Sequence, residues 1–215
     1  MTVSKGGGSV RGKFIVIEGL DGSGKSTHIG LLADFLKSRS VAVHTTAEPT
    51  EGYVGRHLRE MLANSENKDM CLQSALFLAD RLDHVTHPTE GINAYLDRGI
   101  TVISDRYYYS SFAYQGTATD IDWVMDMNLN CPKILTPDLC IFLDVDPQVC
   151  QNRIKAERAN LELYERDVEI MNEVRKNFYI VFGRLASREN ISIINANRDV
   201  SEISKDILDV AEAIY

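Results

Sequence analysis

The sequence predicts an α/β fold, with a mostly parallel, five-stranded sheet and helices on both of its faces. Five short apolar runs rich in β-branched residues are typical of buried strands, and they lie at residues 14–17, 41–45, 100–104, 139–145 and 191–194. Each interval between them carries helical periodicity, as in the apolar stripe of Ile29, Leu32 and Leu36. Strands and helices that alternate through short connections form parallel sheets, whose ligands bind beyond the carboxyl ends of the strands.

Residue types at three helix ends agree with this alternation. Gly99 is suited to end a helix before the strand that begins at Ile100. Asp146 and Pro147 are suited to the N-cap and the first position of a helix. We expect Ser201 to cap the last helix in a similar way.

Length and composition suit one globular domain. The chain has 215 residues, of which 44% are hydrophobic and 25% are charged, and such a chain can bury a full core. Glycines at 6–8 predict that residues 1–12 form a flexible N-terminal tail, so that residues 13–215 form the domain. The highly charged stretch at about 153–166 predicts a mobile lid on the surface of this domain.

Charge and hydropathy disfavour several classes of partner. The formal net charge of -8 argues against a surface that binds nucleic acid. No apolar run is long enough for a signal peptide or a membrane span. Four cysteines lie at no metal or redox spacing, and we expect reduced, mostly buried thiols. We therefore expect a soluble, cytoplasmic protein that binds neither nucleic acid nor membranes.

Residues 19–26, with the sequence GLDGSGKS, match the P-loop pattern G-x-x-x-x-G-K-[ST]. They lie between a predicted strand and a predicted helix, as this motif requires, which disfavours the alternative of a glycine-rich turn that binds nothing. Backbone N–H groups bind the phosphates, Lys25 reaches the β- and γ-phosphates, and Ser26 ligates Mg²⁺. The predicted ATP-binding residues are Gly19, Asp21, Gly22, Ser23, Gly24, Lys25, Ser26 and Thr27.

A P-loop does not define the reaction, because GTPases, motor ATPases and small-molecule kinases share it. A guanine-specific switch would carry Asn-Lys-x-Asp after a late strand, whereas residues 195–199 read NANRD. This difference weakens the GTPase alternative.

Asp105 and Arg106 follow a predicted strand, at the end where ligands bind in open α/β sheets. The guanidinium of Arg106 can clamp a phosphate, and Asp105 can hold either that guanidinium or the magnesium shell. The alternative is a structural Asp-Arg pair at a strand end.

Phe77 and Arg81 are four residues apart on a predicted helix and so project from the same side. An aromatic ring beside a guanidinium can grip a nucleobase. The alternative, which spacing alone favours, is that Phe77 belongs to the core and Arg81 to the solvent.

With these features together, the chain resembles the thymidylate kinases, most closely their prokaryotic and archaeal members. The resemblance covers nearly everything after the tail. It rests on FIVIEGLDGSGKST at 14–27, EP at 48–49, FLADR at 77–81, DRY at 105–107 and AYQG at 113–116, in the family's order. The segments PDL at 137–139, FLDV at 142–145 and ELYE at 162–165 also resemble the family's fourth strand and the end of its lid.

The resemblance implies transfer of the ATP γ-phosphoryl group to dTMP, giving dTDP and ADP, with Mg²⁺ as cofactor and in a homodimer. Another nucleoside or nucleoside monophosphate kinase is the alternative in the same class. A P-loop ATPase or switch without a small acceptor is the alternative from another class.

Several residue roles follow from the resemblance alone. It implies that Phe77 stacks on thymine, that Arg81 donates to the base edge and that Arg106 grips the dTMP phosphate. It places Asp21 near the deoxyribose 3′-hydroxyl and Tyr114 where a ribose 2′-hydroxyl would be crowded out. The remaining implied substrate-binding residues are Ser110, Ser111, Gln115 and Tyr164.

Two positions depart from the family pattern. Gly22 stands where some members carry a basic residue that offsets charge in the transition state, and the resemblance implies that the lid supplies this charge instead. Arg153 and Arg158 are the favoured catalytic candidates, Lys155 and Arg166 are further ones, and a solvated helix face is the alternative. Ala47 stands where bacterial and archaeal relatives commonly carry arginine, and the resemblance implies that a contact, or only a structural ion pair, is missing here.

Overall fold

A single parallel sheet organises the computed structural model, which describes residues 10–64, 69–157, 164 and 167–215. Its strand order is β2-β3-β1-β4-β5 and every neighbouring pair is parallel. The strands are β1 (Phe14–Gly19), β2 (Val43–Ala47), β3 (Thr101–Asp105), β4 (Leu139–Asp144) and β5 (Ile191–Asn195). The predicted parallel, five-stranded α/β sheet is thus confirmed, and β2 begins two residues later than predicted.

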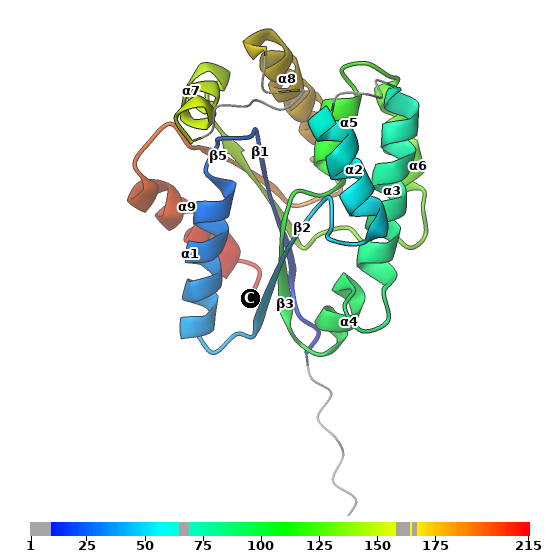
Figure 1. Cartoon of the computed structure of the whole chain (residues 1–215). Coiled ribbons are helices and arrows are strands. Elements are labelled where there is room, and N and C mark those ends of the chain that lie inside the picture. Colours follow the sequence, from blue (N-terminus) through cyan, green and yellow to red (C-terminus); the bar gives the residue numbers. More distant parts are fainter. Residues whose placement is uncertain (1–9, 65–68, 158–163, 165–166) are drawn as a thin grey trace, which may run out of the picture.

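Helices cover both faces of this sheet (Figure 1). Helices α1 and α9 lie on one face, α4, α5 and α8 on the other, and α2, α3 and α6 pack outside the second layer. Helix α7 lies beyond the carboxyl ends of the strands, beside α8. The helices are α1 (Lys25–Ser38), α2 (Tyr53–Asn64), α3 (Met70–Thr86), α4 (Ile92–Asp97), α5 (Tyr108–Gln115), α6 (Ile121–Leu129), α7 (Pro147–Glu157), α8 (Val168–Leu185) and α9 (Val200–Glu212).

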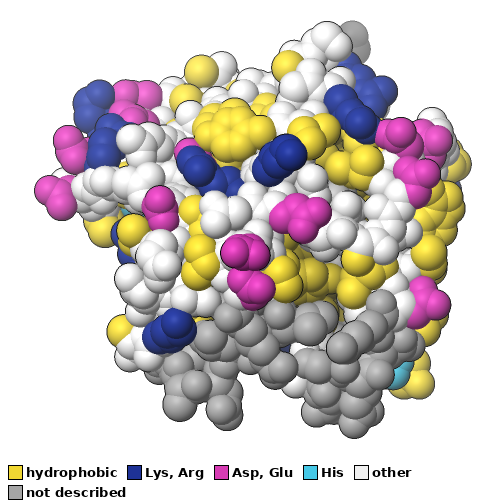
Figure 2. Space-filling view, turned by 90° about the horizontal axis from the view of Figure 1, so that it is seen from above, with side chains coloured by type: hydrophobic (Ala, Val, Ile, Leu, Met, Phe, Trp, Pro, Cys, Tyr) yellow, Lys and Arg dark blue, Asp and Glu magenta, His cyan; other side chains and the backbone are white. Residues whose placement is uncertain are grey.

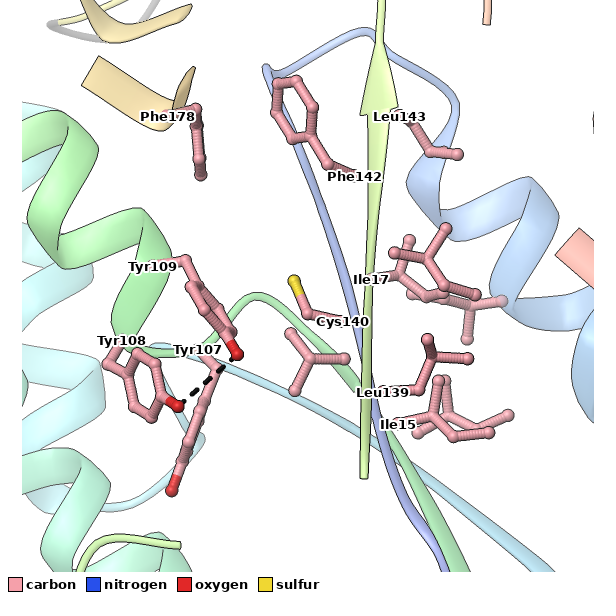
Figure 3. Packing of buried hydrophobic residues seen from close by; sticks show 14 of the residues in the cluster. Ile15, Ile17, Tyr107, Tyr108, Tyr109, Leu139, Cys140, Phe142, Leu143 and Phe178 are labelled. Atoms are coloured by element: carbon pink, nitrogen blue, oxygen red, sulfur yellow. Dashed lines mark hydrogen bonds between the residues drawn. The ribbon is translucent and has the colours of Figure 1, made fainter. Parts of the chain in front are cut away.

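The core is built on the central strand β1 and its neighbour β4, in both of which every residue is buried. Alternate residues point to opposite faces of a strand, as Figure 3 shows for β4: Leu139 and Leu143 lie on the α1 side, and Cys140 and Phe142 on the other. The ring of Phe142 packs on Phe178 of α8, with centroids 4.7 Å apart. A sheet packed on both faces holds the carboxyl ends of β1 and β3 rigidly, and these ends carry the motif residues.

Two of the three predicted helix ends are confirmed. Gly99, with φ of 76°, follows α4, and Asp146 Oδ1 accepts a hydrogen bond from Gln148 N at 2.7 Å where Pro147 opens α7. The prediction for Ser201 is wrong, because Asp199 is the N-cap of α9 and forms a capping box with Glu202. Ser201 lies inside the first turn.

Two composition-based expectations concern membranes and cysteines. Among the described residues, no helix combines the length and apolar character that crossing a bilayer requires. All four cysteines are free thiols: Cys140 and Cys150 are buried, but Cys131 is half-buried and Cys71 is exposed.

Candidate active site

The P-loop connects β1 to α1 and carries two glycines in left-handed conformations, Gly22 with φ of 77° and Gly24 with φ of 95°. A Cβ added to Gly22 would lie 2.6 Å from the carbonyl oxygen of Cys150 on α7. A side chain at position 22 would therefore meet both backbone strain and a clash. This contact explains why this chain cannot carry a basic residue there without moving α7.

Lys25 is buried at the base of the loop. Its Nζ donates to the carbonyl oxygens of Gly19 and Leu20, both at 3.2 Å. Two carboxylates lie further away, with Nζ 3.8 Å from Asp21 Oδ1 and 3.9 Å from Asp105 Oδ1. Burial, and then the charge of Arg106, lower the pKa of Lys25. The cation is thus held in a desolvated position where a polyphosphate would meet it.

Ser26 and Asp105 form a pair of oxygen ligands beside the loop. Ser26 Oγ donates to Asp105 Oδ2 at 3.5 Å, and Asp105 Oδ1 is buried yet has no hydrogen-bond partner within the described residues. Hydroxyl and carboxylate oxygens suit Mg²⁺, which keeps several waters or phosphate oxygens. The described ranges hold no group of three or more His, Cys, Asp or Glu arranged for a metal. The pair therefore fits an ion that the nucleotide itself helps to hold.

Arg106 has φ of 71°, which is unusual for a residue with a side chain. Its Nη2 donates to Asp21 Oδ1 at 2.6 Å and to Tyr114 OH at 3.2 Å, and its Nη1 donates to Ser110 Oγ at 2.8 Å. The guanidinium is therefore held by Asp21 of the P-loop and not by Asp105, which faces Ser26 and Lys25.

A cavity of about 360 Å³ lies next to Arg106. It is lined by Asp21, Glu48, Pro49, Arg59, Leu62, Ala63, Phe77, Arg81, Arg106, Tyr107, Ser110, Ser111, Tyr114, Gln115 and Tyr164. We call it the acceptor cavity. Every substrate-binding residue predicted above lines it. Its volume is within the range of small-molecule sites, and its aromatic and polar lining suits a nucleoside.

Arg81 lies in the wall of the acceptor cavity and is only 1% exposed. Its Nε donates to Glu48 Oε2 at 2.8 Å, its Nη1 to Asn128 Oδ1 at 2.6 Å and its Nη2 to Ser111 Oγ at 3.1 Å. The alternative that placed Arg81 in solvent is wrong, because side chains from three other segments enclose its guanidinium. Phe77 is half-buried and lines the same cavity.

The side chains of Tyr114, Gln115 and Tyr164 form another part of the wall of the acceptor cavity. The ring of Tyr164 meets that of Tyr114 edge to face, with centroids 5.1 Å apart, and Tyr164 OH lies 3.2 Å from Met70 Sδ. Gln115 is 2% exposed, and its Oε1 has no hydrogen-bond partner within the described residues. A buried amide oxygen without a donor is costly, so this wall is suited to a ligand that offers one.

A second cavity surrounds the P-loop and adjoins the first. We call it the phosphate cavity; it is lined by P-loop residues 21–28 with Ala47, Asp105, Arg153, Arg198, Val200 and Ile203. Five residues line both cavities: Asp21, Glu48, Pro49, Arg59 and Arg106. The two cavities therefore meet beside Asp21 and Arg106. Figure 2 looks down on this end of the molecule, where Lys and Arg side chains lie close to Asp and Glu side chains.

Arg59 at this junction was missed by sequence reasoning. It is half-buried on α2, where its Nη1 donates to Thr50 O at 2.7 Å and its Nη2 donates to Pro49 O. It belongs to no motif, and the only signal for it is a basic residue on a helix that follows the Glu-Pro segment.

The structure places part of the predicted lid. Residues 153–157 are the last residues of α7, and Arg153 Nη1 donates to Gly22 O at 3.2 Å. Arg153, one of the two basic candidates on α7, thus reaches Gly22, which lacks a side chain. Arg158 and Arg166 lie outside the described residues. Ala47 is exposed in the phosphate cavity.

Comparisons with known proteins agree with this geometry. The family model for thymidylate kinase matches residues 17–207. A probable thymidylate kinase of Pyrococcus abyssi is 36% identical over 206 residues, covering 93% of this chain and 95% of the relative. One from Pyrobaculum calidifontis is 38% identical over 200 residues (93% and 95%), and one from Thermococcus kodakarensis is 34% identical over 211 (94% and 98%). Because the family model covers residues 17–207 and these relatives are at least 34% identical over at least 93% of the chain, this chain belongs to the thymidylate kinase family.

Proposed function

We propose that this protein is a thymidylate kinase, which transfers the γ-phosphoryl group of ATP to dTMP and releases dTDP and ADP. The observation that carries the proposal is the meeting of the phosphate cavity and the acceptor cavity at Asp21 and Arg106. A γ-phosphate on the P-loop and a monophosphate on Arg106 would then face each other. Phosphoryl transfer depends mainly on such positioning and on electrostatic stabilisation.

The charged side chains at the junction have distinct roles in this mechanism. Lys25 neutralises the β- and γ-phosphates, Arg106 orients the acceptor phosphate, and Arg153 places a third cation next to Gly22. The acceptor is already an anion at neutral pH, so no protein nucleophile is required. Ser26 and Asp105 would hold Mg²⁺, which when bound supplies positive charge against the phosphate oxygens. Arg158 stays a catalytic candidate.

The acceptor cavity supports recognition of a deoxynucleotide. Phe77 supplies a ring on which thymine can stack, and Arg81 and Gln115 supply polar groups for the base edge. The hydroxyls of Ser110 and Ser111 bind Arg106 and Arg81 in this structure, so these serines act on the ligand partly through the two arginines. Tyr114 stands beside Asp21, with its OH 3.5 Å from Oδ2, where it would crowd a ribose 2′-hydroxyl. A homodimer and a cytoplasmic location stay predictions from the family resemblance.

The test is a coupled assay of turnover with dTMP, dUMP, dCMP, dGMP and thymidine as acceptors, each with Mg·ATP. We expect the highest kcat/KM with dTMP and little turnover of thymidine, because thymidine lacks the phosphate that Arg106 binds. Preference for another monophosphate would support the alternative kinase. ATP consumption that does not depend on an added acceptor would support the ATPase alternative.

Replacing Phe77 with alanine is expected to raise KM for dTMP. Stacking of a base on an aromatic ring contributes about 1–3 kcal/mol, which corresponds to roughly 5- to 150-fold. KM for ATP should change less than about twofold, because Phe77 does not line the phosphate cavity. Phe35→Ala is the matched control, since Phe35 lies on α1 and lines neither cavity. An equal rise in both KM values would contradict the stacking role.

A further inference from the structure

We propose that Glu18 is a positioning residue that holds Arg106 and Ser110 in place at the acceptor cavity. The inference rests on the proposed function, since it concerns the residue that would bind the acceptor phosphate. Glu18 lies on β1 with none of its surface exposed. Its Oε1 accepts hydrogen bonds from Tyr107 N at 2.9 Å and Ser110 N at 3.1 Å, and its Oε2 accepts one from Ser110 Oγ at 2.6 Å.

These donors lie at the start of α5. The first N–H groups of a helix have no partner inside it and usually bond to the side chain of the N-cap residue. Here the N-cap residue is Tyr107, whose side chain makes no such bond. Glu18 supplies a side-chain acceptor from a strand more than 80 residues earlier; Ser110 N also donates to Tyr107 O at 3.1 Å. Its negative charge also suits the positive end of the helix.

The same carboxylate acts on Arg106 through two connections. First, Arg106 directly precedes Tyr107 and has φ of 71°, a conformation that persists only when surrounding contacts hold it. Second, Ser110 Oγ donates to Glu18 and accepts from Arg106 Nη1 at 2.8 Å. Because Glu18 accepts the hydrogen bond from the Ser110 hydroxyl, the lone pairs of Ser110 Oγ stay available to the guanidinium of Arg106.

Holding this carboxylate in the core is unfavourable for the fold. Burial raises the pKa of Glu18 from 4.5 to about 7, although Arg106, Ser110, Tyr107 N–H and Lys25 act in the opposite direction. A carboxyl whose pKa is raised on folding loses its stabilising contribution as pH rises through the folded value. At pH 8 the ionised group therefore weakens the fold. A carboxylate whose only role was to stabilise the fold would not be expected at this buried position.

The experiment compares wild type with Glu18→Gln. The amide can still accept from Tyr107 N and Ser110 N, but its NH₂ would donate to Ser110 Oγ and compete with Arg106. At pH 8 we expect kcat/KM for dTMP to fall about tenfold or more, with KM for ATP within about threefold and an unchanged or higher Tm. The proposal would be overturned if Glu18→Gln retained its kcat/KM for dTMP. It would also be overturned if kcat/KM fell equally for dTMP and ATP and Tm was lower.

A pH series separates positioning from a loss of fold. Protonated Glu18 has the donor and acceptor pattern of glutamine, so the ratio of wild-type to variant kcat/KM should shrink from pH 8 to pH 6. The ratio cancels titration of the dTMP phosphate, which both enzymes share. Lys25 is followed separately through KM for ATP, because burial lowers the pKa of Lys25 and the charge of Glu18 acts in the opposite direction. Tyr114 and Cys140, the other titratable groups near the Glu18 carboxylate, stay neutral, because burial raises the pKa of each. A ratio that does not change with pH would contradict the role of the carboxylate.

Two further variants keep the test decisive. Asp138→Asn is the matched control, because Asp138 Oδ2 accepts from Phe14 N at 2.8 Å at the opposite end of β1; its kcat/KM should stay within about twofold. Ser110→Ala removes the hydroxyl that bonds to both Glu18 and Arg106 and leaves the backbone hydrogen bonds to Glu18 in place. This variant tests the same connection if Glu18→Gln does not fold. It should also lose about tenfold for dTMP, and full retention would refute the proposal. If wild type prefers another monophosphate, the same comparison with that acceptor tests Glu18 independently of the proposed function.

Discussion

A Lys25→Met variant is expected to lose roughly 10³-fold in kcat, since it removes a desolvated cation that acts on the transferring phosphate. The fold should not suffer. Burial lowers the pKa of Lys25, which means that the folded state disfavours its charge. A neutral side chain of similar length should leave Tm unchanged or raise it. The measurement is kcat at saturating ATP and dTMP, with a thermal melt of the same preparation.

Lys37→Met is the matched control for this variant. Lys37 lies on the same helix, α1, with 56% of its side chain exposed and only a 3.8 Å ion pair to Asp34. Exposed pairs contribute about 0–1 kcal/mol, so its kcat and Tm should match those of wild type. Full activity in Lys25→Met would refute the mechanism.

An Arg106→Gly variant is expected to lose about 10²- to 10³-fold in kcat/KM for dTMP, because it lacks the guanidinium that orients the acceptor phosphate. Glycine is chosen because φ of 71° at this position carries no strain without a Cβ. Relief of the backbone offsets only part of the lost contacts with Asp21, Ser110 and Tyr114. We therefore expect a lower Tm, and the kinetics are measured well below it. The measurement is steady-state kinetics with each substrate varied in turn.

Arg106→Lys separates charge from geometry. Lysine keeps the positive charge but cannot bind Asp21 and Ser110 through two nitrogens at once, so we expect kcat/KM between that of wild type and the glycine variant. Arg39→Ala is the control, because Arg39 is exposed, forms a surface ion pair with Glu212 at 3.1 Å and lies over the Phe35 ring, away from both cavities. A KM for ATP that rises as much as that for dTMP in Arg106→Gly would show that Arg106 does not serve the acceptor.

Features that depend on neighbouring residues were predicted well from the sequence. All five strands lie within two residues of the predicted runs, because strands buried on both faces need continuous apolar residues. The P-loop was predicted as a unit, since its glycines, lysine and serine act within eight consecutive positions. The exception is the N-cap of α9, where Ser201 and Asp199 are both suitable and only the contact with Glu202 decides.

Contacts between distant segments were predicted poorly. Arg106 pairs with Asp21, 85 residues earlier, and not with its neighbour Asp105. Arg81 was expected on spacing grounds to face solvent, yet Glu48, Asn128 and Ser111 enclose it. Arg59 belongs to no motif, and Glu18 lies within the segment 14–27 but nothing local in that segment indicates its partners. Arg106, Arg81 and Glu18 take partners that lie 30 or more residues away, which a local sequence pattern does not contain. Arg59 bonds to Thr50 and Pro49, 9 and 10 residues earlier, and only the packing places it at both cavities.

The sequence by itself determined the parallel α/β fold, the phosphate-binding loop and the family, because these depend on residue patterns that are short and contiguous. Only the tertiary structure decided that Asp21, Arg106 and Arg59 lie where two cavities meet, and that Glu18 accepts hydrogen bonds from Tyr107 N and Ser110 beside Arg106. The physical reason is that parallel strands bring their carboxyl ends to one edge of the sheet whatever their separation along the chain. Hydrogen bonds across that edge then depend on register and packing.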